Sequence, residues 1–178
     1  MKLFKKLLII IFSIAIIATA SIYAIWHNEI ATVASIKTII NQDLSHDDGY
    51  TYEMYVSGDY YFEDFLKQGG ATNDAELIQF VTDHITKGLI PMTIKSKEIA
   101  CSSFTAWTED NKFVFGRNYD FDQTNTAIVH TSPKGRHASI STIDLQFLGI
   151  KEEPGISSIK EKALLLAAPY IPLDGIND

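Results

Sequence analysis

The residue best suited to chemistry in this sequence is its only cysteine, Cys101. Arg117 and Asp120 follow it by 16 and 19 residues, beyond the polar turn Thr108–Lys112. In a hairpin the end of the second strand returns beside the start of the first, so both side chains can reach Cys101. A guanidinium group close to a thiol stabilises the thiolate, which is the nucleophilic form. A surface ion pair between Arg117 and Asp120 would explain the same spacing without any chemistry.

Cleavage of the chain before Cys101 would give this cysteine its own base. If the Ala100–Cys101 bond is cut, Cys101 carries a free α-amine, whose reference pKa is about 7.7–8.0. The amine can take the thiol proton at neutral pH, directly or through a water, so one residue supplies both nucleophile and base. A carboxylate at Asp120 could accept hydrogen bonds from the ammonium group. The alternative interpretation is an inert, buried thiol in an exported chain.

The stretch from Cys101 to Phe121 resembles the opening of the choloylglycine hydrolase family of N-terminal-nucleophile amidases. That family includes conjugated bile acid hydrolases and penicillin V acylases, and acid ceramidase and N-acylethanolamine acid amidase are its relatives. Its pattern is Cys-Thr/Ser, a polar turn, and then Gly-Arg-Asn-x-Asp followed by an apolar residue. The matching residues here are Cys101, Ser102, Gly116, Arg117, Asn118, Asp120 and Phe121. The segment 172–178, PLDGIND, is similar to a downstream Asp-Gly-x-Asn-Glu segment of the family and contains Asn177.

The resemblance implies an αββα sandwich and hydrolysis of linear amide C–N bonds through a thioester acyl-enzyme. By it, Cys101 is the nucleophile, Arg117 tunes the thiol, Asp120 holds the amine, and Asn118 and Asn177 support the site. It also implies an oxyanion hole that uses an asparagine beyond residue 178, on a continuation of the chain or on a second chain. The implied substrates are N-acyl compounds such as bile acid conjugates, penicillin V-like amides, N-acyl amino acids or acyl-homoserine lactones. No cofactor or metal is implied, and a homo-oligomer is compatible with it.

The same resemblance suggests how Cys101 becomes an N-terminus. About 75 residues separate the leader from Cys101, as in the acid ceramidase branch, where self-cleavage releases an N-terminal segment. Attack of the Cys101 thiol on the Ala100 carbonyl, an N-to-S acyl shift, would cut the chain there. We therefore expect residues 27–100 to form a propeptide-like segment and residues 101–178 to form the first part of the amidase domain.

The N-terminus predicts export. Lys2, Lys5 and Lys6 precede an uncharged apolar run of 20 residues, Leu7–Trp26. Residues 18–20, Ala-Thr-Ala, fit a signal peptidase site, and the run is also long enough to cross a bilayer. Two interpretations of residues 1–26 stay open: a cleaved signal peptide, or an anchor that leaves the body outside the cytoplasm.

Periodicity predicts an α+β fold, with helices first and an antiparallel sheet from Cys101 on. Helices are expected at 27–45 and 60–67, with a strand beginning near residue 50. A further helix should follow the N-cap Asn73, with Glu76 completing a capping box and Gly88 ending it. The expected strands are 101–107, 113–121, 126–132 and 139–150, with a helix or strand near 161–170. Since helices could cover one face of the sheet only, we expect a further layer outside this sequence.

Composition limits the partners. The chain has 178 residues, 46% of them apolar, and a formal charge of −7. Without the three leader lysines, 12 basic residues face 22 acidic ones, a charge of −10, which disfavours nucleic acids and anionic surfaces as partners. The five histidines are scattered, which disfavours a zinc site. Besides the amidase, two hypotheses remain: a non-catalytic, anchored binding domain, and an exported β-domain with a structural cysteine.

Overall fold

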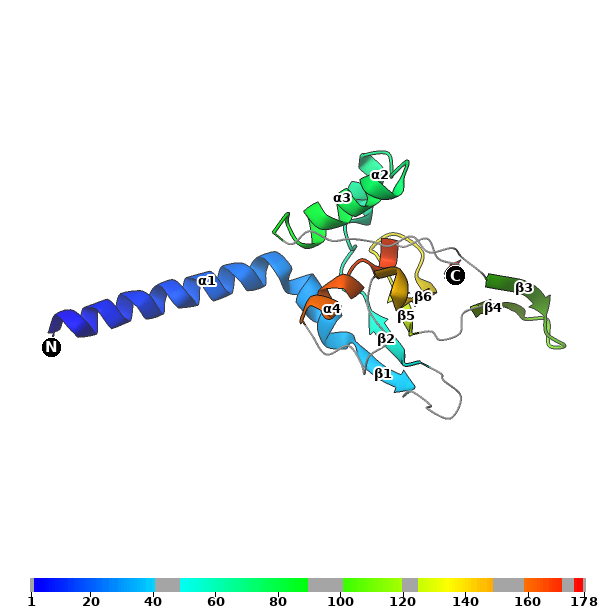
Figure 1. The fold of residues 1–178 in the computed structure, drawn as a ribbon, viewed down its shortest axis with the longest axis horizontal. Helices are drawn as coiled ribbons and strands as arrows, with labels where there is room; N and C mark the ends of the chain where they lie inside the picture. Colours follow the sequence, from blue (N-terminus) through cyan, green and yellow to red (C-terminus); the bar gives the residue numbers. More distant parts are fainter. Residues whose placement is uncertain are drawn as a thin grey trace.

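The structure, a computed structural model, describes residues 2–40, 49–89, 101–119, 125–148, 159–170 and 175–177. They form a mixed α+β protein, as the sequence predicts. Figure 1 shows a long N-terminal helix that projects from a body of helices and sheet, with a separate hairpin at the opposite end.

The N-terminal helix α1 spans Lys2–Ser35 and has non-helical backbone angles at Trp26 (φ −117°, ψ 22°). Its first part is the expected apolar helix, and it is the one helix among the described residues long and apolar enough to cross a membrane. The helix expected over 27–45 ends earlier, at Ser35, because Lys37–Ile40 forms strand β1. Thr38, Ile39 and Ile40 are β-branched residues, which favour a strand.

A five-stranded sheet with the order β1-β2-β5-β6-β7 forms the centre of the body. Its other strands are β2 (Thr51–Tyr55), β5 (Thr126–Thr131), β6 (Ser139–Asp144) and β7 (Gly175–Asn177). β7, which the sequence did not predict as a strand, pairs antiparallel with β6. The expectation of antiparallel neighbours is correct for β5–β6. It is wrong for the other side of β5, which pairs in parallel with β2. The sheet thus takes strands from both sides of Cys101, and the segment before Cys101 is only partly helical.

The described helices of the body are short. They are α2 (Phe62–Lys67), α3 (Asp74–Ile85) and α4 (Ile159–Leu165), with 3₁₀ turns η1 (Leu145–Leu148) and η2 (Ala168–Tyr170). The predicted cap of α3 is confirmed, since Asn73 Oδ1 accepts a hydrogen bond from the Glu76 backbone at 3.0 Å. The Glu76 carboxylate accepts from the backbone N–H of Thr72 at 2.8 Å. This hydrogen bond lowers the pKa of Glu76.

The fourth predicted strand, 139–150, ends at Asp144. Its carboxylate accepts a hydrogen bond from the Gln146 backbone at 2.9 Å and turns the chain into η1. A side chain that satisfies the backbone two residues later favours a turn over continued strand pairing.

One face of the sheet carries the core. Met54 on β2, Val129 on β5 and Ile143 on β6 are fully buried. Helix residues including Val81 and Leu165 complete the same cluster. Strand residues alternate between faces, so Glu53, Tyr55 and His130 lie on the opposite face.

The hairpin of β3 (Cys101–Trp107) and β4 (Phe113–Tyr119) forms a separate two-stranded sheet. In the described part of the chain its backbone pairing is confined to these two strands. In Figure 1 the hairpin lies at the end of the molecule farthest from the start of α1.

Candidate functional site

The hairpin register brings the predicted arginine beside the first residues of β3. Cys101 pairs with Tyr119, Ser102 with Asn118, and Ser103 with Arg117. Residues directly opposite each other share a face of the ladder, with Cβ atoms about 4.5–5.5 Å apart. The backbone of Cys101 therefore lies one cross-strand pair from Asn118 and two from Arg117.

The connecting turn is locally determined. The Thr108 N–H donates to the Lys112 carbonyl at 2.8 Å, and the Lys112 N–H donates to Thr108 Oγ1 at 3.0 Å. Asn111 has a positive φ of 60°, a conformation that asparagine tolerates better than most residues. An exposed ion pair between Lys112 and Asp110 at 2.6 Å completes the turn. Thr108–Lys112 thus sets the register that places Arg117 opposite Ser103.

Gly116 has a structural role in this hairpin. It pairs directly with Phe104, and a Cβ at position 116 would collide with the Phe104 ring. The ring therefore covers the glycine backbone, as aromatic side chains often do across a strand pair. The glycine that precedes Arg117 thus has a packing role of its own, independent of the function of its neighbours.

Several of the predicted site residues fall partly or wholly outside the described residues. Ala100 and Asp120 lie outside them, as do the side chains of Cys101 and Asn177. The backbone of Asn177 is described: it belongs to β7 and pairs with Ser139 of β6. Asn177 is therefore in the five-stranded sheet, whereas Cys101, Arg117 and Asn118 are in the hairpin.

A second polar cluster, which sequence reasoning missed, lies on the face of the five-stranded sheet opposite the core. Glu53 is its centre. Its carboxylate lies 2.7 Å from Lys37 Nζ and 3.0 Å from His130 Nε2, and it accepts a hydrogen bond from the Tyr55 hydroxyl at 3.0 Å. The Tyr55 and His130 rings stack with their centroids 4.3 Å apart. A carboxylate only accepts hydrogen bonds, so Nε2 of His130 is the donor in this contact.

The charges in this cluster shift each other's proton affinities. The hydrogen bond from Lys37, and then that from Tyr55, lower the pKa of Glu53. The same pairing raises the pKa of Lys37, and the bond to Glu53 raises the pKa of Tyr55. The cluster is therefore organised around an ionised Glu53.

A cavity of about 310 Å³ adjoins this cluster where β2, β5 and β6 meet. Its walls combine the Tyr55 and His130 rings with the apolar side chains of Val56 and Ile140 and with Ser139. Small-molecule sites have volumes of about 300–1,000 Å³ and mix apolar walls with a few polar groups. The cavity is thus at the lower end of the size range for a small organic ligand.

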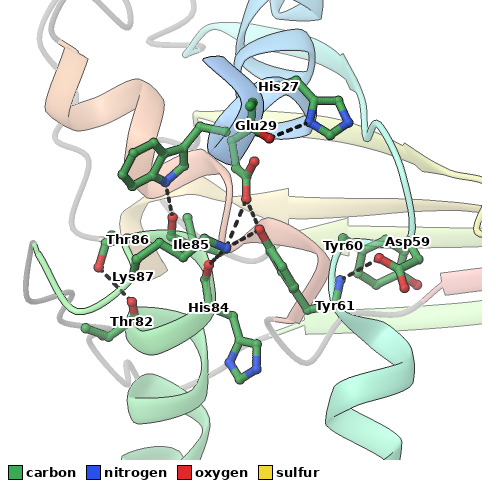
Figure 2. A network of polar contacts seen from close by, with 12 residues as sticks. His27, Glu29, Asp59, Tyr60, Tyr61, Thr82, His84, Ile85, Thr86 and Lys87 are labelled. Carbon is green, nitrogen blue, oxygen red and sulfur yellow. Dashed lines mark hydrogen bonds and ion pairs between the residues drawn. The ribbon is translucent and has the colours of Figure 1, made fainter. Parts of the chain in front are cut away.

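A third polar cluster joins α1 to the body, as Figure 2 shows. The Tyr61 hydroxyl donates to Glu29 Oε1 and accepts from Lys87 Nζ, which also donates to the His84 carbonyl. Lys87 Nζ lies 3.7 Å from Glu29 and 4.1 Å from the centroid of the Tyr61 ring. Burial, and then the bond to Glu29, raise the pKa of Tyr61.

The backbone at this junction is strained. Tyr60, Tyr61 and Lys87 have positive φ angles of 44°, 63° and 53°, which are unfavourable for residues with large side chains. Such conformations persist only where the surrounding structure determines them. Here the hydrogen bonds to Tyr61 and Lys87 hold both residues in place. We interpret this cluster as structural, since each of its three side chains is already engaged by the other two.

The sequence carried a weak signal for the second cluster. Alternation in TYEMY and TAIVHT places Glu53 and His130 on the polar sides of their strands. Nothing local, however, indicates that Glu53 and His130, 77 positions apart, lie on strands that pair in parallel. The contact is therefore a property of the topology.

Within the described residues no group of three or more His, Cys, Asp or Glu side chains is placed to hold a metal ion. Comparison of the chain with protein-family models, with curated proteins and with solved structures found no match.

Proposed function

We propose that this protein is an exported cysteine hydrolase of linear amide C–N bonds, with Cys101 as its nucleophile. The observation that supports it best is the hairpin register. The register starts β3 at Cys101 and places Arg117 and Asn118 on the returning strand within two cross-strand pairs. Asp120 follows Tyr119, the pairing partner of Cys101, in the sequence.

The proposed first step is self-cleavage. The Cys101 thiolate adds to the Ala100 carbonyl, the C–N bond breaks, and the amide nitrogen takes a proton to become the α-amine of Cys101. The result is a thioester between Ala100 and the Cys101 sulfur. Water hydrolyses the thioester, which releases the segment ending at Ala100 and leaves a free thiol and a free amine on one residue.

The proposed turnover then repeats this chemistry on an external N-acyl amide. The α-amine of Cys101 accepts the thiol proton, the thiolate attacks the acyl carbon, and the protonated amine returns the proton to the leaving nitrogen. Water hydrolyses the acyl thioester. Arg117 supplies positive charge near the thiolate, and the Asp120 carboxylate orients the ammonium group.

Covalent labelling of Cys101 and hydrolysis of a substrate test this proposal together. The full chain is incubated with an electrophilic analogue of an N-acyl amide, and its hydrolysis of penicillin V is followed by release of the amine. The proposal predicts labelling at Cys101 that penicillin V slows. Labelling of wild-type protein no faster than of urea-unfolded protein, together with no hydrolysis, would contradict it.

A second candidate function is ligand binding by an anchored, non-catalytic domain. The cavity of about 310 Å³ beside Tyr55 and His130 favours it, because it is independent of the hairpin. The probe is phenylacetamide, which combines an aromatic ring with an amide. Binding would shift the ring resonances of His130 and would be lost in Ile140→Trp, which fills the cavity. An uncleaved, unlabelled chain with such shifts would favour this function over the amidase.

A further inference from the structure

The apolar run ends where α1 meets the body. Side chains from Leu3 to Ile25 are exposed along the helix, and none of its most apolar window is buried in the protein. Trp26 closes the run, and its indole N–H donates to the Ile85 carbonyl at 3.1 Å. Tryptophan is enriched at the headgroup level of a bilayer, where its ring and its N–H face different environments.

The body begins within the same helix, without a linker. In the last turns of α1, Glu29 and Thr32 are buried. Thr32 Oγ1 accepts from the Ser57 backbone at 2.9 Å, and Ser35 Oγ accepts from the Tyr55 backbone at 2.8 Å. The helix that emerges from the apolar run is therefore hydrogen-bonded directly to the end of β2 and to the residues that follow it.

The turn after α3 lies at the same level as Trp26. Ile85, the partner of the indole N–H, is the last residue of α3, and the turn Thr86–Leu89 follows it. The backbone of Leu89 donates to the Thr86 carbonyl at 3.0 Å, which closes the turn. Leu89 is nevertheless 72% exposed. Figure 2 shows the end of α3 beside α1, with Lys87 directed toward Glu29.

We propose that α1 is a retained anchor and that the body sits directly on the bilayer, with Trp26 and Leu89 both in the headgroup region. The Glu29–Tyr61–Lys87 cluster fixes the angle between the helix and the body. The partner is the uncharged, zwitterionic lipid surface, because a body with a formal charge of −10 gains nothing from anionic headgroups. The leader lysines then lie on the cytoplasmic side.

A fluorescent label at position 89 tests the contact. In a Cys101→Ala chain, Leu89→Cys is labelled with bimane and reconstituted into phosphatidylcholine vesicles whose acyl chains are brominated near the headgroup. A label at Glu109→Cys, in the exposed hairpin turn at the far end of the molecule, is the matched control. We expect strong quenching at position 89 and none at position 109. Equal, weak quenching at both positions would overturn the proposal.

Two further measurements test its parts. In the position-89 background, Tyr61→Phe removes the hydroxyl that links Glu29 to Lys87. We expect the quenching to fall toward the control level while far-UV circular dichroism stays unchanged, and unchanged quenching would overturn the role of the cluster. The intact mass of the membrane-extracted Cys101→Ala chain needs no label. Loss of its first 20 residues would overturn the retained anchor, whereas a chain that keeps them supports it.

Discussion

Ser103 and Arg117 stand directly opposite each other in the β3–β4 hairpin. This pairing sets how far along the hairpin Arg117 lies from the start of β3. The pairing itself results from the length of the Thr108–Lys112 turn. A change of one residue in the turn would move Arg117 to the other face of the ladder. The chemistry proposed for Cys101 therefore depends on the turn as much as on the arginine itself.

Replacing Arg117 should make the thiol less reactive at neutral pH. Without the nearby positive charge the thiolate is less favoured, so Arg117→Met should shift the pH profile of Cys101 alkylation upward and slow it about tenfold at neutral pH. The control is Lys112→Met, which removes an exposed charge in the same hairpin. Equal alkylation profiles for wild type and both variants would show that Arg117 does not act on the thiol.

Whether Gly116→Ala lowers the stability of the hairpin should depend on the Phe104 ring. In the wild-type background, Gly116→Ala must displace the Phe104 ring and should reduce hairpin stability by about 0.2–1 kcal/mol. With Phe104→Ala present, the same change should be neutral or stabilising, because alanine suits a strand better than glycine. Urea denaturation of all four chains, followed by Trp107 fluorescence, measures the coupling. Additive effects would show that the ring does not cover the glycine.

Tyr61 should make stability sensitive to alkaline pH. Its pKa is raised in the folded protein, so the stability it contributes is present below the unfolded tyrosine value of about 10 and is lost as pH rises above it. Tyr61→Phe should cost about 1–2 kcal/mol at neutral pH and should flatten the loss above pH 10. Denaturation curves between neutral pH and pH 11 check this. Because burial also raises the pKa of Tyr170, Tyr170→Phe is needed as the comparison.

Protonation of Glu53 should contribute to the loss of folding stability at low pH. Its pKa is lowered mainly by Lys37, so the stability it contributes is present above its unfolded value of about 4.3 and is lost as pH falls through the folded value. Glu53→Gln should therefore flatten the decline of the melting temperature below about pH 4.3. Glu63→Gln, which removes a carboxylate paired with Arg136, is the matched control. If Glu53→Gln leaves the decline of the melting temperature at low pH unchanged while Glu63→Gln reduces it, Glu53 is not the centre of its cluster.

Local features of this fold were predictable, whereas its long-range pairings were not. The Asn73 cap, the Thr108–Lys112 turn and the apolar helix each follow from a few consecutive residues. The parallel pairing of β2 with β5 joins segments that α2, α3 and the hairpin separate along the chain, so no periodicity reveals it. The same applies to the contact between Glu29 and Lys87. Of the candidate site, the hairpin could be predicted, and the cluster around Glu53 required the topology.

The intact mass of the purified full chain tests the central claim most directly. Wild-type protein and Cys101→Ala are expressed in parallel, extracted from membranes and weighed by mass spectrometry. We predict that the wild-type chain splits between Ala100 and Cys101 and that Cys101→Ala stays whole. Wild-type protein that remains uncut under the conditions in which Cys101 is alkylated, or a cut that persists in Cys101→Ala, would contradict self-cleavage by this cysteine.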